Sequence, residues 1–91
     1  MKLKNHVTTQ PIEENLLILD LEGNVYFSLN ETGRFMLESL LKGWSMEQTA
    51  QEAEKIFYAS YERLLSDLKA FVETLQQENL IEMDDADSFD E

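Results

Sequence analysis

The stretch that decides the fold runs from Asp20 to Phe35 and reads DLEGNVYFSLNETGRF. Gly23 and Asn24 both tolerate positive φ, which a tight hairpin turn requires. In the segment VYFSL that follows, alternation places Val25, Phe27 and Leu29 on one face of a strand. Asn at position 30 is a favoured helix N-cap. The stretch therefore predicts the end of one strand, a turn, a second strand and the start of a helix.

Upstream of this stretch, the sequence predicts a short strand followed by a longer one. The segment NLLILDLEG, residues 15–23, is rich in Leu and Ile and is expected to form the first arm of the hairpin, with residues 22–24 supplying the turn. Residues 7–9, Val-Thr-Thr, favour a short first strand because β-branched side chains suit a pleated surface. We expect Pro11 to end that strand, since proline donates no N–H to a neighbouring strand.

Downstream of the stretch, the first helix is expected over residues 31–42. Glu31 lies in the first turn, where a negative charge interacts favourably with the helix dipole. Gly33 is costly inside a helix and is explained if a strand backbone packs close to it. Gly43 follows the last apolar residue and ends the helix as its C′ residue.

Two more helices follow, the second opening at Ser45 and the third near Ser60. SMEQ, residues 45–48, is a capping-box pattern. The third helix is expected to end near Glu78, with Asn79 as a left-handed C-terminal cap, and residues 80–81 then fold back on the core. Its apolar residues recur at spacings of three and four and form a broad stripe: Tyr61, Leu64, Leu65, Leu68, Phe71, Val72 and Leu75.

These elements predict a small winged-helix-like α+β domain over residues 1–81, with a two- to three-stranded antiparallel sheet followed by three helices. Nothing after Leu29 is expected to be a strand that could cover the segment Val25–Leu29. That segment therefore lies at a sheet edge, and an uncovered edge is a template for another chain.

Charge and composition exclude several classes of function. The net charge is −12, from 19 acids against 7 bases, which disfavours binding to nucleic acid or to an anionic membrane. Residues 82–91, EMDDADSFDE, hold six acids and no base, and we expect them to be a disordered tail. Cysteine is absent, no apolar segment follows the basic start, and the longest unbroken apolar run is Leu16–Leu19. We expect a cytoplasmic protein.

No group of residues indicates catalysis or a cofactor. His6 is the sole histidine, and we interpret it as a solvated residue rather than a metal ligand. The acidic tail lacks the glycine that a calcium loop needs, so no metal site is expected. Asp67 lies beside the apolar stripe and is expected to pair with Arg34, Arg63 or Lys42. The chain is therefore predicted not to be an enzyme and to need no cofactor.

Aromatic residues and a helix-turn-helix spacing offer further interpretations. Phe57, Tyr58 and Tyr61 lie between the second and third helices and are expected to be core. The spacing of these helices resembles a DNA-binding helix-turn-helix. The third helix carries four acids and two bases, however, and would repel phosphates.

The segment EGNVYFSLNETGRFMLESLLKG, residues 22–43, resembles the PqqD family of pyrroloquinoline quinone biosynthesis protein D-like domains. Family members have a strand ending in Leu-Asn, a Thr-Gly that opens a helix, and an apolar helix that ends in Gly. A small-residue helix like SMEQTAQEAEKIF and a Leu-rich end like SDLKAFVETLQQENLI follow. The resemblance spans about residues 15–81. Asn79 departs from the glycine that is common in the family.

The resemblance implies a non-catalytic module that recognises the leader segment of a ribosomally synthesised precursor peptide. The leader adds as an antiparallel strand to the third strand of the sheet, rests against the third helix, and is presented to a modifying enzyme or protease. The enzyme is a lasso-type protease or a radical enzyme, and the module is a monomer or weak homodimer. A regulatory or structural interaction module and a winged-helix DNA-binding protein remain the alternatives.

The predicted leader site has two parts. The edge strand contributes Asn24, Val25, Tyr26, Phe27, Ser28 and Leu29. On the third helix, a helical wheel places Leu65, Lys69 and Val72 on one margin of the apolar stripe and Leu64, Asp67 and Phe71 on the other. We favour the first margin, giving a helix surface of Leu65, Leu68, Lys69 and Val72 with Tyr61 at one end. The sequence leaves open which margin faces the strand.

Overall fold

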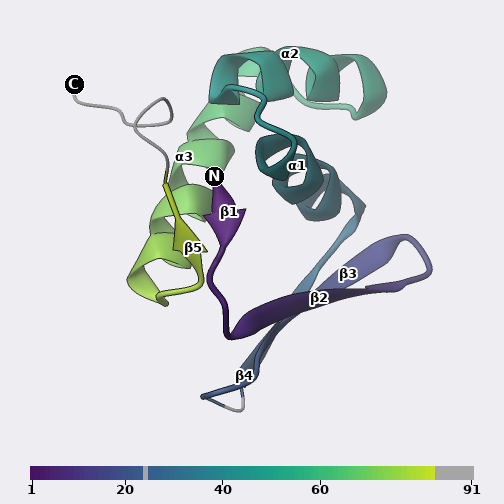
Figure 1. Ribbon diagram of the computed structural model, residues 1–91. Helices are drawn as coiled ribbons and strands as arrows, with labels where there is room; N and C mark the ends of the chain where they lie inside the picture. The colour runs from purple at the N-terminus through teal and green to yellow at the C-terminus, as the bar shows by residue number, and fades with distance from the viewer. Residues whose placement is uncertain (24, 84–91) are drawn as a thin grey trace.

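A computed structural model describes residues 1–23 and 25–83, in which a sheet and three helices form two layers (Figure 1). Its strands are β1 (Lys2–Leu3), β2 (Val7–Ile12), β3 (Asn15–Asp20), β4 (Val25–Leu29) and β5 (Ile81–Glu82). Its helices are α1 (Glu31–Leu41), α2 (Met46–Ile56) and α3 (Tyr61–Gln77). The α+β prediction, with an N-terminal antiparallel sheet followed by three helices, is confirmed.

The main sheet has the order β2-β3-β4 and is antiparallel throughout, so β3 is central and β4 lies at an edge. The prediction that Pro11 ends the first strand is wrong. Strand β2 continues to Ile12, and Pro11 lies opposite Leu16. Proline is tolerated here because β2 is the other edge strand, where a missing N–H need not break a ladder.

A second sheet pairs the two ends of the described chain. Strand β1 is antiparallel to β5, with Lys2 opposite Glu82 and Leu3 opposite Ile81. The sequence placed Glu82 in the acidic tail, but the residue is paired in β5, and its carboxylate lies 3.9 Å from Lys2 Nζ. Residues 84–91, the rest of the predicted tail, lie outside the described residues.

The connection between β3 and β4 is longer than the tight turn that Gly23 suggested. Asp20 lies opposite Val25, so four residues join the strands. Asp20 Oδ1 accepts hydrogen bonds from the N–H groups of Glu22 (3.1 Å) and Gly23 (3.0 Å), which is how aspartate organises a turn. A Cβ at position 23 would lie 2.8 Å from Asp20 Oδ2, so a larger residue here would require the Asp20 carboxylate to shift.

The core lies between the inner face of the sheet and the helices. Leu16 and Ile18 alternate along β3 and are buried, as a half-buried strand predicts. Leu80 and Ile81 fold back on the core and are buried, as predicted. Gly33 is explained by the side chain of Leu29 rather than by the expected strand backbone, because a Cβ there would lie 3.3 Å from Leu29 Cβ.

The helix N-termini follow the sequence prediction closely. Asn30 Oδ1 accepts from Gly33 N–H at 2.9 Å and opens α1 directly after β4. Ser45 and Ser60 cap α2 and α3 in the same way. Gly43 takes a φ of 101° just after α1, as expected of a C′ residue.

Asn79 ends α3 with a φ of 63°, which confirms the predicted left-handed cap and provides a test of the fold. A β-branched residue is strained in this region, whereas glycine is not. We expect Asn79→Val to lower the free energy of unfolding by about 1–2 kcal/mol. Asn79→Gly, the matched control, should leave it equal or slightly higher. Urea unfolding followed by circular dichroism measures both, and equal losses would contradict the assignment of the cap.

Candidate functional site

The outer edge of β4 is the first feature of the candidate site. Within the described residues, β3 is the only strand that pairs with β4. The sequence of β4 is VYFSL, which has no charged residue and no proline. Native proteins usually protect exposed edges with such residues, with bulges or with a covering element. An edge without these devices is able to accept another extended chain through backbone hydrogen bonds.

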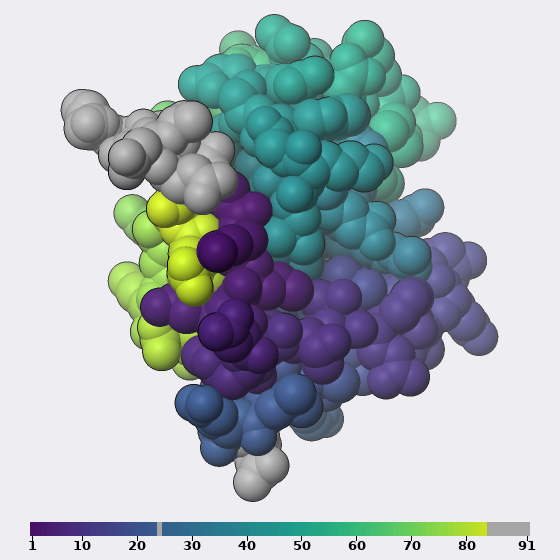
Figure 2. Space-filling view, in the orientation of Figure 1, coloured from purple at the N-terminus to yellow at the C-terminus, as the bar shows by residue number. Residues whose placement is uncertain are grey.

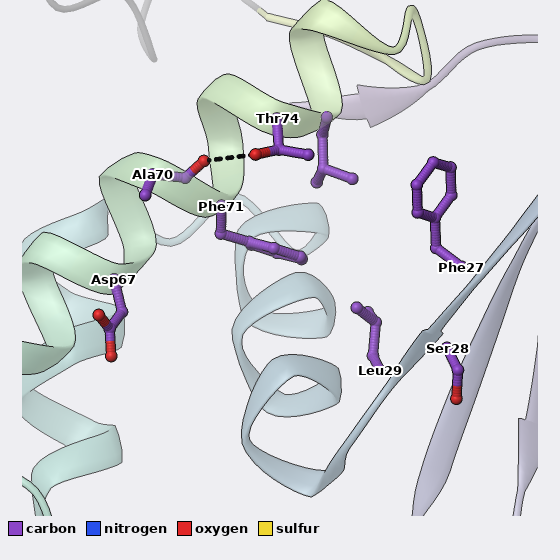
Figure 3. A pocket seen from close by; sticks show the side chains of 8 residues that line it. Phe27, Ser28, Leu29, Asp67, Ala70, Phe71 and Thr74 are labelled. Atoms are coloured by element: carbon purple, nitrogen blue, oxygen red, sulfur yellow. Dashed lines mark hydrogen bonds between the residues drawn. The ribbon is translucent and has the colours of Figure 1, made fainter.

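A groove of about 440 Å³ runs beside this edge, between β4 and α3 (Figure 3). Its strand wall consists of Phe27, Ser28 and Leu29, and its helix wall of Asp67, Ala70, Phe71, Thr74 and Leu75. In Figure 3 the side chain of Phe71 projects from the helix toward the strand. The Thr74 hydroxyl donates to the carbonyl of Ala70 at 3.0 Å, so it is already satisfied within the helix. The groove therefore offers mainly apolar surface, with one carboxylate.

The groove lies along the other margin of the third helix from the one that the sequence analysis favours. Leu68 and Val72 are core residues with 0% and 3% exposure, so they present no surface to a ligand. Leu65 packs partly against the core and Lys69 is exposed, and neither lines the groove. The margin beside β4 is instead the one that contains Asp67 and Phe71. The helical wheel gave the angles between these side chains but not the rotation of the helix against the sheet.

The other predicted site residues have clear positions. Val25 and Tyr26 are exposed, and Phe27 and Leu29 are half-buried on the core-facing side of β4. Tyr61 is half-buried against the core and does not close the groove. Asn24 lies outside the described residues. The structure thus brings Phe27, Ser28 and Leu29 together with Asp67 and Phe71, and not with Leu65 or Lys69.

A second hollow, of about 560 Å³, continues from the groove past the end of β4. Asp67 lines both spaces, and Arg63 Nε lies 3.6 Å from its carboxylate, which is one of the predicted ion pairs. Phe57 lines the hollow and packs edge-on against Phe35, with 5.8 Å between ring centres. Tyr58 also lines it but is fully exposed, so the prediction that it is a core residue is wrong.

Comparison with known proteins identifies the family. The model described as coenzyme PQQ synthesis protein D (PqqD) matches residues 15–81. The chain belongs to the PqqD family. None of the curated proteins matches it at a significant level.

Two solved structures share the fold of this PqqD-family chain. The first is TbiB1 in complex with the TbiA(beta) leader peptide: the TM-score is 0.77, the identity is 23%, and the alignment covers 93% of this chain and 100% of that chain. The second is lasso peptide synthetase B1 complexed with the leader peptide: the TM-score is 0.80, the identity is 22%, and the coverage is 87% of this chain and 93% of that chain.

The described part of this PqqD-family chain contains no cluster of three or more His, Asp or Glu residues that could hold a metal ion. Nor does it contain a helix long and apolar enough to span a membrane.

The interpretation of His6 as solvated is wrong. Its side chain is only 16% exposed, and its ring nitrogens lie 3.9 Å from Asp20 Oδ1 and 4.0 Å from Glu22 Oε1.

Proposed function

We propose that this PqqD-family chain is a non-catalytic module that binds the leader segment of a ribosomally synthesised precursor peptide. The leader adds as a strand to β4 and is presented to a modifying enzyme or protease, most simply in a lasso-peptide pathway. The observation that carries this proposal is the coincidence of an unprotected strand edge with an apolar groove along the same strand. Strand addition needs both parts, because backbone bonds give affinity and pockets give specificity.

The comparisons add support of a different kind. Both of the solved structures described above contain a leader peptide by their own descriptions. One of them is a lasso peptide synthetase component, which favours a lasso-type protease over a radical enzyme as the downstream partner of this chain. The charge of −12 argues against nucleic acid and anionic membranes as partners. We further propose that the module works in the cytoplasm.

The direction of the bound leader follows from antiparallel pairing. A strand added antiparallel to β4 begins near Leu29 and proceeds toward Val25. Its residues opposite Leu29 and Phe27 are two apart and share the face of those side chains, so they enter the groove. The leader residue between them, opposite Ser28, points to the other face. The groove therefore selects apolar side chains with a period of two.

The added strand also relates the leader to the two ends of β4. Its N-terminal end passes Asn30 and the second hollow, which adjoins the groove through Asp67. Its C-terminal end passes Val25 and the connection between β3 and β4. The core segment, which follows the leader in the precursor, therefore departs from the hairpin end of the module.

An NMR titration tests the proposal. The ¹⁵N-labelled chain is titrated with the leader segment of any precursor whose gene neighbours its own. We expect the largest amide shifts in residues 25–29 and on the Asp67–Leu75 side of α3, and new protection of β4 amides from hydrogen exchange. A leader with alternate apolar residues replaced by aspartate is the control and should not bind. Saturating leader that leaves β4 and α3 amides unchanged would exclude strand addition.

A further inference from the structure

Exposed apolar side chains gather at the hairpin end of the sheet, away from the leader groove. Leu21 and Tyr26 are 64% and 65% exposed, and Val25 is about half exposed. Together with Leu19 and Asp20, they line a hollow of about 250 Å³. We call these five residues the hairpin patch. In Figure 2 the hairpin end, in blue, forms the lower edge of the molecule and projects from its body.

The fold gives no reason for this patch. Leu19 and Tyr26 lie on the face of the sheet that the helices do not cover, Asp20 and Val25 lie at the end of the other face, and none of the five residues is part of the buried core. Leu21 lies in a connection that Asp20 already organises through hydrogen bonds to Glu22 and Gly23, so its side chain is not needed for the turn. Exposed apolar surface that neither folding nor the groove uses is typical of a protein interface.

We propose that the hairpin patch docks the enzyme that acts on the core segment of the precursor, an inference that rests on the proposed function. The direction of the leader selects this patch over the exposed Ile56 and Tyr58 near the second hollow. Those residues lie where the N-terminal end of the leader passes, whereas the hairpin patch lies where the core segment departs. An enzyme bound at the hairpin patch therefore lies next to the point where the core segment leaves the module.

The charges around the patch specify the chemistry of the docking surface. The Asp20 carboxylate lines the hollow, and Glu22 beside it is 79% exposed in its side chain. His6 lies between these two carboxylates at 3.9 and 4.0 Å. The enzyme therefore presents an apolar side chain that fills the hollow, flanked by a lysine or arginine that faces Glu22. A basic residue on the enzyme is also attracted at a distance by this chain, whose net charge is −12, and the attraction speeds their association.

The test separates docking from leader binding. The probes are a purified precursor and a purified protease or modifying enzyme, taken from any such genes that neighbour the gene of this chain. Two variants leave the groove untouched: Leu21→Glu changes the hairpin patch itself, and Glu22→Lys changes the charge beside it. The control is Ile12→Glu, at the tip of the other hairpin, where the side chain is similarly exposed. Leader affinity is measured by fluorescence anisotropy, and affinity for the enzyme by biolayer interferometry with the leader present.

We expect all three variants to bind the leader within about twofold of wild type. Leu21→Glu should weaken enzyme binding and slow precursor processing at least about tenfold, as expected for an apolar residue at the centre of an interface. Glu22→Lys should weaken enzyme binding less and reduce its dependence on salt. Unchanged enzyme affinity in Leu21→Glu, or no effect of the wild-type chain on the enzyme, overturns the docking surface while leader binding stands. Failure of the wild type to bind leader overturns both proposals.

Discussion

Replacing Phe71 by glutamate is expected to weaken leader binding by at least about 30-fold, which corresponds to about 2 kcal/mol. Phe71 is half-buried in the helix wall of the groove, opposite Leu29 and Phe27. The substitution removes an apolar wall and puts a carboxylate close to Asp67, where bound peptide would desolvate both charges. Isothermal titration calorimetry with the leader segment measures the loss.

Leu65→Glu is the matched control for this prediction. Leu65 is also half-buried on α3, but it lies on the other margin of the helix and does not line the groove. Both variants lose similar apolar contact with the core, so thermal unfolding should report similar destabilisation. We expect leader affinity within about threefold of wild type for Leu65→Glu, because no groove contact changes. Equal affinity losses in the two variants would contradict the placement of the groove.

Leu68→Ala is expected to lower the free energy of unfolding by about 3 kcal/mol without removing the leader site. Leu68 has 0% exposure and belongs to the core formed by the sheet and helices. Truncating a buried leucine loses its transfer free energy and leaves a cavity, which costs 2–5 kcal/mol in general. For a domain of this size, the melting temperature should fall by roughly 12–24 °C.

The folded Leu68→Ala protein should keep its affinity for the leader within about threefold at a temperature where it remains native. Differential scanning calorimetry measures the change in stability, and anisotropy at 10 °C measures the affinity. Ala70→Ser, on the same helix but exposed in the groove, is the comparison and should change stability little. A stable Leu68→Ala protein with lost affinity would mean that Leu68 contacts the peptide directly.

The local structure of this chain follows from the sequence because its causes are local. Asn30, Ser45 and Ser60 begin helices since their side chains reach N–H groups three residues away. Gly43 and Asn79 end two helices because they accept positive φ. The period of two in residues 25–29 likewise defines which side chains of β4 share a face.

The existence of the open edge also followed from the sequence. After Leu29 the periodicity becomes helical, and the only later described strand, β5, is two residues long and pairs with β1. Strands this short carry no periodic pattern, so the β1–β5 pair was not predicted. The family resemblance over residues 15–81 then linked the open edge to peptide binding, and the family itself is confirmed.

Two features were decided only by tertiary structure. One is the rotation of α3, which puts Asp67 and Phe71 beside β4 and turns Leu68 and Val72 into the core. The apolar stripe of α3 is wide enough to pack against both the other helices and the sheet. Its pattern does not specify which margin faces β4, since that depends on how α1, α2 and the sheet pack together. The other is the hairpin patch, whose exposure depends on how far the helices extend over the sheet. Sequence periodicity reports which residues share a face, whereas only packing decides what that face meets.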